Sequence, residues 1–251
     1  MWPLLSQLSR VHLRLRTSLL ASRNLTTSCC HQLDNRVKAT QNTLYELRTY
    51  TLYPEKMREF LTLTEEHLHL RTAHSKLLGY WTSEIGGLNQ VVHIWEYESL
   101  THRAEVRARL AGDPEWLGRY VSCVIGMWQQ QDNVLLALLP GTAIKHPSGK
   151  GVYELQTLHM KGPRSAWCEA LVKHVRVCEE AAREGRSRAV GVWSSLLGPT
   201  HMAAVLWQHN TPDCCLALKA AADSLVDMTL SSHVHSGHSK LLLPHAVSSL
   251  Q

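Results

Sequence analysis

The stretch YELRTY at residues 45–50 decides the fold, because it returns as YELQTL at residues 153–158. GYW at residues 79–81 returns in the same way as GVW at residues 191–193. The copies lie roughly 110 residues apart, which is the size of a small domain and longer than the unit of a solenoid. The sequence therefore predicts a duplicated domain, with a first copy at residues 44–144, a linker at 145–151 and a second copy at 152–251.

Each copy has the pattern of strand, helix, hairpin, helix and strand. The expected segments of the first copy are 44–52, 54–75, 80–85 with 90–97, 101–128 and 134–138. Those of the second copy are 152–159, 163–184, a hairpin through Gly198-Pro199, 212–224 and 240–243. This is the ferredoxin-like order of the α+β class, in which both helices cover one face of a four-stranded antiparallel sheet.

The other face of each sheet needs a cover, because four tryptophans lie in sheet segments. Burying each of these rings stabilises the fold by roughly 2 to 3 kcal/mol. We therefore expect the tandem repeats to pack face to face into a pseudo-two-fold barrel. The tryptophans expected to line its lumen, or a pocket in it, are Trp81, Trp95, Trp193 and Trp207.

The basic character of the chain comes from its first 43 residues. The net charge is +5, and four arginines precede Asp34, the first acidic residue: Arg10, Arg14, Arg16 and Arg23. An apolar stripe at helical spacing, with arginine and serine around it and no acids, is typical of a mitochondrial transit peptide. A disordered or surface-binding basic tail is the alternative. We expect a mitochondrial protein, in the matrix or at a membrane, with a cytosolic pool.

Two classes of partner are not expected. The body after the leader is nearly neutral and has no stripe of interleaved basic and aromatic residues, which argues against nucleic acid. No apolar run approaches the roughly 20 residues of a transmembrane helix.

The cysteines bear on the redox compartment. Seven cysteines, an odd number without Cys-x-x-Cys spacing, favour a reducing compartment over a disulfide framework.

Several stretches of the body resemble the NIPSNAP family, and most nearly its subgroup of the third NipSnap homologue. The matching stretches are YELRTYTLYPEKMREF (45–60), HLRTAHSKLLGYW (69–81), HIWEYESLTHRAEVR (93–107), GVYEL (151–155) and LLLP (241–244). The resemblance implies the dimeric α/β-barrel superfamily and mitochondrial association. For some members it implies a scaffold role, in which the protein is displayed on damaged mitochondria and recruits autophagy machinery. It transfers no catalytic residue.

The second copy departs from this pattern in its second helical region, which is about eight residues shorter than the corresponding region of the first copy. A shorter helix covers less of its sheet, so we expect apolar surface near the final strand. Such a surface would favour a homo-oligomer.

Histidines supply two candidate sites. His67, Arg71 and His74 share a helix face and would line a pocket, although solvent or a structural hydrogen bond is the preferred interpretation. The run His233-Val234-His235-Ser236-Gly237-His238 is the densest histidine cluster, but a polar loop is favoured over a metal site. No nucleotide-binding, metalloprotease or nucleophile-elbow motif is present. We expect no cofactor and no catalytic residue.

Two functions are compatible with these features. The first is a non-enzymatic mitochondrial adaptor that binds proteins, such as autophagy receptors or modifiers, in mitochondrial quality control. Trp193-Ser194-Ser195-Leu196 fits the short pattern that autophagy modifiers read, but Trp193 is interpreted as a core residue of a strand. The alternative, by fold analogy, is a barrel that binds a small molecule or haem and has monooxygenase-like activity. A filled lumen favours the first and an open polar lumen the second.

Overall fold

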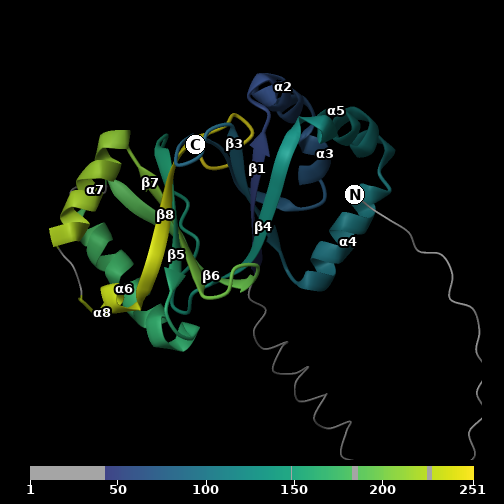
Figure 1. Cartoon of the computed structure of the whole chain (residues 1–251). Helices are drawn as coiled ribbons and strands as arrows, with labels where there is room; N and C mark the ends of the chain where they lie inside the picture. The colour runs from purple at the N-terminus through teal and green to yellow at the C-terminus, as the bar shows by residue number, and fades with distance from the viewer. Residues whose placement is uncertain (1–42, 148, 183–185, 225–227) are drawn as a thin grey trace, which may run out of the picture. The chain divides into compact units, whose positions relative to one another are not determined.

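The structure is a computed structural model that describes residues 43–147, 149–182, 186–224 and 228–251 (Figure 1). The predicted transit peptide and its four arginines lie outside the described residues. None of the described helices is long and apolar enough to cross a membrane.

The first half of the described chain runs strand, helices, two strands, helices, strand. Pro54 begins the first helical turn, and the Ser99 hydroxyl caps the later helix by accepting a hydrogen bond from the backbone N–H of His102, at 3.0 Å. The elements are β1 (Leu44–Leu52), η1 (Pro54–Lys56), α2 (Met57–His67), α3 (His69–Thr72), β2 (Lys76–Ile85), β3 (Gln90–Tyr97), α4 (Leu100–Ala111), η2 (Trp116–Val121), α5 (Ser122–Val124), η3 (Ile125–Met127) and β4 (Trp128–Leu138).

The second half follows the same order of elements. Its helices begin after Pro163 and at Pro212, where the missing N–H of proline costs no helical hydrogen bond. The elements are β5 (Val152–Met160), α6 (Arg164–Ala181), β6 (Ser187–Leu197), β7 (Met202–His209), α7 (Pro212–Ser224), α8 (Met228–His233) and β8 (Val234–Pro244).

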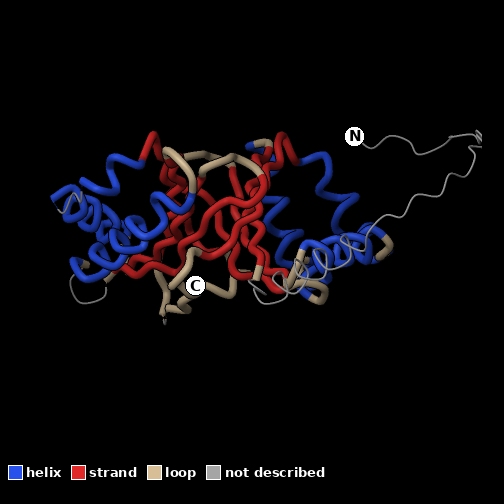
Figure 2. Tube along the Cα trace, turned by 90° about the horizontal axis from the view of Figure 1, so that it is seen from below, coloured by secondary structure: helices blue, strands red, loops and turns tan. Residues whose placement is uncertain are grey.

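The eight strands form one closed barrel in the order β1-β3-β2-β8-β5-β7-β6-β4. Each half supplies four adjacent strands, and the two halves join where β2 pairs with β8 and where β4 pairs with β6. The helices of each half lie outside its own strands, so that the barrel sits between two helical groups (Figure 2). The mixed α/β barrel that the sequence predicts is confirmed.

The interior of the barrel is filled by apolar side chains from both halves. Trp81 and Trp193 are both fully buried there. The Trp81 ring packs on Tyr153, with centroids 5.4 Å apart, and the Trp193 ring packs on Tyr45, with centroids 5.7 Å apart. Each tryptophan therefore pairs with a tyrosine of the opposite half, and such pairs add about 0.5 to 1.5 kcal/mol each beyond the area they bury.

The expectation that Trp95 and Trp207 line the lumen is wrong. Both rings are buried on the outer side of the sheet, under the helices of their own half. Successive side chains of a strand alternate between faces, and Ile94 and Leu206 take the inward positions. The register shifts between Leu77 and Gly79 and between Ala189 and Gly191 place Trp81 and Trp193 inward, a detail that the spacing of tryptophans does not reveal.

The closing strand of each half is longer than the sequence predicts. β4 begins at Trp128 and β8 at Val234, because both extend along the full length of a neighbouring strand, β1 and β5 respectively. The second sheet is therefore complete although residues 210–233 form a shorter connection than residues 98–127. The exposed part of β8, residues 235–238, carries histidine, serine and glycine. The expectation of an apolar surface on this part of the strand is therefore wrong.

A first prediction concerns the glycine that lies two residues before each interior tryptophan. A Cβ atom at Gly79 would overlap the Trp81 ring, and one at Gly191 would overlap the Trp193 ring. Gly79→Ala and Gly191→Ala should therefore displace the rings and destabilise the protein by about 1 to 3 kcal/mol, and Trp81→Ala or Trp193→Ala by about 3 to 5 kcal/mol. Urea unfolding measures both effects, with Gly118→Ala as the control because its Cβ would meet no atom within 4 Å. Unchanged unfolding midpoints would contradict this packing.

Candidate functional site

The structure does not bring His67, Arg71 and His74 together. The Arg71 guanidinium is buried and lies over the Trp95 ring, 3.8 Å from its centroid. The nearest acidic partners of the two histidines are Glu66 for His67, at 3.6 Å, and Asp113 for His74, at 3.7 Å. Leu68, which lies between α2 and α3, keeps right-handed helical dihedrals, so the three side chains differ in their contacts rather than in the path of the backbone. Arg71 therefore has a structural contact rather than a place in a shared pocket.

The structure also places the other two candidates from the sequence, which are the histidine run at residues 233–238 and the Trp193–Leu196 segment. His235 and His238 are exposed on β8 rather than in a loop, and His233 ends α8. These histidines belong to no metal-compatible group among the described residues. Trp193 is fully buried, which confirms that it is a core residue and leaves the Trp193–Leu196 segment without an accessible aromatic side chain.

The residue that both halves bury on the helix side of the barrel is a glutamate. Glu46 on β1 pairs with Trp95 across the sheet, and Glu154 on β5 pairs in the same register with Trp207. Each carboxylate is only 1% exposed. Because a buried charge must be compensated by hydrogen bonds or by opposite charge, the neighbours of these two glutamates define their chemistry.

Glu46 is held by guanidinium groups. Its Oε1 accepts hydrogen bonds from Arg48 at 2.9 Å, Arg103 at 2.7 Å and Asn133 at 2.7 Å. Its Oε2 accepts one from the Tyr97 hydroxyl at 3.2 Å. Burial alone would raise the pKa of Glu46, but these donors and the two positive charges outweigh burial and hold the pKa well below its usual value.

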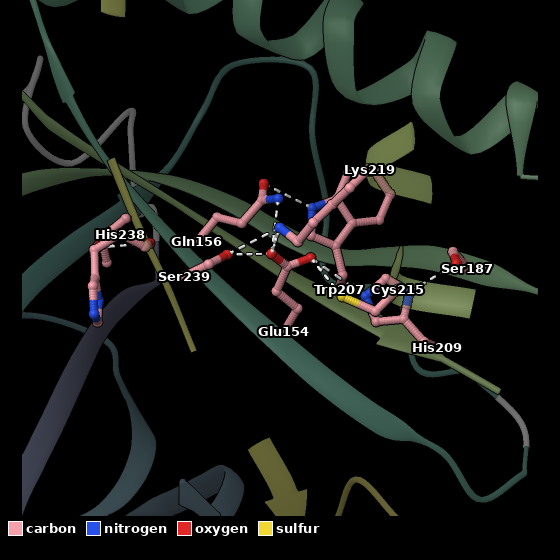
Figure 3. A network of polar contacts seen from close by, with 10 residues as sticks. Glu154, Gln156, Ser187, Trp207, His209, Cys215, Lys219, His238 and Ser239 are labelled. Carbon is pink, nitrogen blue, oxygen red and sulfur yellow. Dashed lines mark hydrogen bonds and ion pairs between the residues drawn. The ribbon is translucent and has the colours of Figure 1, made fainter. Parts of the chain in front are cut away.

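Glu154 occupies the same place with different neighbours (Figure 3). The Cys215 thiol donates to Oε2 at 3.4 Å, and Nε2 of His209 lies 3.6 Å from the same oxygen. Lys219 and Ser239 contact Oε1, to which Gln156 also donates at 3.2 Å. Five neighbours thus come from four elements: β5, β7, α7 and β8.

Four of the five neighbours of Glu154 occupy positions equivalent to those of the four neighbours of Glu46, and Lys219 is the addition. Gln156 and Ser239 face each other across the sheet as Arg48 and Asn133 do. His209 corresponds to Tyr97, since His209 pairs with Val152, the first residue of β5, and Tyr97 pairs with Leu44, the first residue of β1. Cys215 is the fourth residue of α7 and Arg103 is the fourth residue of α4. The second half therefore keeps the carboxylate but replaces both arginines.

The charge state of the second cluster follows from these replacements. Burial would raise the pKa of Glu154, but His209, Lys219 and Ser239 outweigh it and lower the pKa to about 2, so the carboxylate is ionised. Burial, with the negative charge of Glu154, raises the pKa of Cys215 to about 12. The thiol is thus protonated at neutral pH and is a poor nucleophile as it stands.

A cavity of about 340 Å³ lies beside this cluster, between α6, α7, α8 and the sheet. Three of its lining residues, Gln156, Lys219 and Ser239, also contact the Glu154 carboxylate. The cavity therefore borders the side chains that surround the carboxylate, whereas Glu154 itself does not line it.

The sequence predicted neither glutamate as a site residue. The one available signal was that Glu46 and Glu154 recur within the repeated YEL stretches, at a position where a strand that packs against helices carries apolar residues. Their partners come from elements far apart in the chain, and no spacing rule connects them.

Replacing the buried carboxylates tests these networks. Glu46→Gln should destabilise the protein by about 3 to 5 kcal/mol at pH 7, because two arginines lose their partner. The folded-state pKa of Glu46 is lowered, so its contribution is complete above the unfolded-state pKa of about 4.3 and is lost as the pH falls through the folded-state value. Urea unfolding at several pH values should show the variant approaching the parent below pH 4. Glu59→Gln, at an exposed position on α2, is the control. An equal deficit at every pH would contradict this account.

The chain is similar to known proteins over most of its length. The NIPSNAP family model matches residues 45–140. Protein NipSnap homolog 3A of Homo sapiens is 37% identical over 199 residues, which covers 78% of this chain and 79% of that protein. Protein NipSnap homolog 3B of Mus musculus is 39% identical over 201 residues, or 79% and 80% of the two chains.

A solved structure of a candidate monooxygenase from Lactobacillus acidophilus NCFM has the same fold, with a TM-score of 0.60 over 81% of this chain and 94% of that chain. At 13% identity, this likeness concerns the fold alone. The identity to the two NipSnap homologues, and the share of each chain that it covers, place the chain in the NIPSNAP family.

Proposed function

We propose that the protein is a non-enzymatic, protein-binding adaptor associated with mitochondria. The observation that carries the proposal is the filled barrel interior. An enzyme that binds its substrate in the barrel lumen needs room there. Here the central space is filled by two tryptophans, two tyrosines and aliphatic side chains that are at most 5% exposed. This packing favours the adaptor over the alternative, a monooxygenase-like barrel that binds haem or another small molecule in its lumen.

The tandem-repeat interpretation is part of the proposal. The equal strand order of the two halves, the equal register around the buried glutamates and the reciprocal tyrosine–tryptophan pairs support two ferredoxin-like copies at residues 44–144 and 152–251. Each copy places a hairpin with an exposed apolar tip at an equivalent position. Ile85 is 63% exposed and Leu197 is 58% exposed. We assign protein binding, either to autophagy receptors and modifiers or to a second copy of the chain, to these two hairpins.

Mitochondrial association rests on the arginine-rich leader and on the resemblance to family members that act in mitochondrial quality control. Replacing Arg10, Arg14, Arg16 and Arg23 with glutamine in a leader–reporter fusion should abolish import, because the membrane potential acts on the positive charge of the leader. Imaging and protease protection of the reporter measure import, and a four-lysine version that keeps the charge is the control. Full import of the glutamine version would contradict the proposed targeting.

The adaptor role is tested with the purified full chain. It should consume no oxygen with haem or quinol substrates beyond a heat-denatured control, and it should bind purified autophagy modifiers or receptors in calorimetric titrations. Ile85→Asp with Leu197→Asp should weaken that binding at least tenfold, the loss of about 1.4 kcal/mol that one apolar interface residue commonly contributes.

Leu216→Asp is the matched control for this experiment, since Leu216 is 65% exposed on α7 and belongs to neither hairpin. Enzymatic turnover above the denatured control would overturn the adaptor role. Binding that the Leu216 variant loses and the hairpin variant keeps would overturn the assignment of the surface.

A further inference from the structure

We propose that Glu154, His209 and Cys215 form a zinc-binding site on the helix side of the second half. A carboxylate oxygen, an imidazole nitrogen and a thiolate sulfur are the three ligand types that zinc takes in proteins. The three ligand atoms lie within 4.8 Å of one another, and all three residues are buried.

Two of the three separations between the ligand atoms fit a tetrahedral ion. With Zn–S near 2.3 Å and Zn–N and Zn–O near 2.0 to 2.1 Å, tetrahedral angles separate the ligand atoms by roughly 3.3 to 3.6 Å. The Glu154 oxygen lies 3.4 Å from Sγ of Cys215 and 3.6 Å from Nε2 of His209. The third separation, between Sγ and Nε2, is at most 4.8 Å, so that side-chain movements would bring the three atoms onto one ion.

The imidazole of His209 is prepared for this role. His209 is fully buried, and its Nδ1 lies 2.7 Å from the Ser187 hydroxyl. Its Nε2, which points toward Glu154 and Cys215, has no hydrogen-bond partner among the described residues (Figure 3). A buried nitrogen without a partner is costly, and a metal ion would satisfy it. The contact of the other ring nitrogen with Ser187 is the outer-shell arrangement that orients metal-ligating histidines.

The first half surrounds its buried glutamate with arginines that the second half lacks. Around Glu46 the guanidinium groups of Arg48 and Arg103 supply positive charge, and the equivalent positions hold Gln156 and Cys215. Among the described residues, the one lysine or arginine in contact with Glu154 is Lys219, which approaches Oε1 and leaves Oε2 to the thiol and the imidazole. A divalent ion at Oε2 would restore the positive charge that Arg103 provides in the first half.

Binding exchanges one proton for the ion. The Cys215 Sγ–H bond breaks, the proton leaves to solvent and an S–Zn bond forms, while Glu154 is already ionised. A water molecule would complete the four-coordinate shell, as in zinc sites with three protein ligands.

Cobalt substitution tests the site, because a Co²⁺–thiolate bond gives a charge-transfer absorption band that protein oxygen and nitrogen ligands do not. Full-length protein, treated with chelator and titrated with Co²⁺, should develop this band at one equivalent and lose it on addition of Zn²⁺. Cys215→Ser should abolish the band, and His209→Gln should weaken Zn²⁺ binding at least tenfold. Circular dichroism verifies that each variant is folded.

Two further variants keep the test decisive. Cys214→Ser, at the neighbouring position of the same helix, should leave the band unchanged. Ser187→Ala touches no ligand atom of the proposed ion and should weaken Zn²⁺ binding about 10- to 100-fold, the usual effect of removing an outer-shell partner. Absence of the band in the parent protein, or a band that Cys215→Ser retains, would overturn the proposal.

Discussion

The reciprocal packing of Trp81 on Tyr153 and Trp193 on Tyr45 inside the barrel is the interaction on which the rest of the structure depends. Each half is a sheet with helices on one side and an apolar face on the other, and neither apolar face is stable in water. The aromatic pairs connect the halves across their interface. Gly79 and Gly191 make room for the two indole rings, so that side chains fill the interior of the barrel.

Because apolar side chains fill the interior of the barrel, the buried charged side chains lie between the sheet and the helices. There both halves bury a glutamate at the same register. In the first half, two arginines make the carboxylate part of a structural ion network. In the second half, Gln156 and Cys215 replace the two arginines, the His209 imidazole replaces the Tyr97 hydroxyl, and a cavity borders part of the cluster. One frame thus supports a structural network on one side of the barrel and a ligand-binding cluster on the other.

The sequence predicted the order of elements, the closed barrel and the burial of Trp193, because these depend on hydrophobic alternation and on a repeat that is visible in one chain. It failed for Trp95 and Trp207, because Ile94 and Leu206 take the inward positions of β3 and β7, whereas register shifts near Gly79 and Gly191 turn Trp81 and Trp193 inward on the partner strands, and composition does not encode these shifts. It also missed the Glu154 cluster. Its members are far apart in sequence, and lysine, serine and cysteine at those positions follow no pattern until folding brings them to one carboxylate.

The two halves share a frame, but of the two buried glutamates only Glu154 lies beside an imidazole and a thiol that suit an ion. Anomalous diffraction at the zinc absorption edge, from crystals of the full chain soaked in zinc, would locate a bound ion. We expect a peak between Glu154, His209 and Cys215, and none at Glu46, where the guanidinium of Arg103 contacts the carboxylate. Peaks at both glutamates, or at neither, would contradict this expectation.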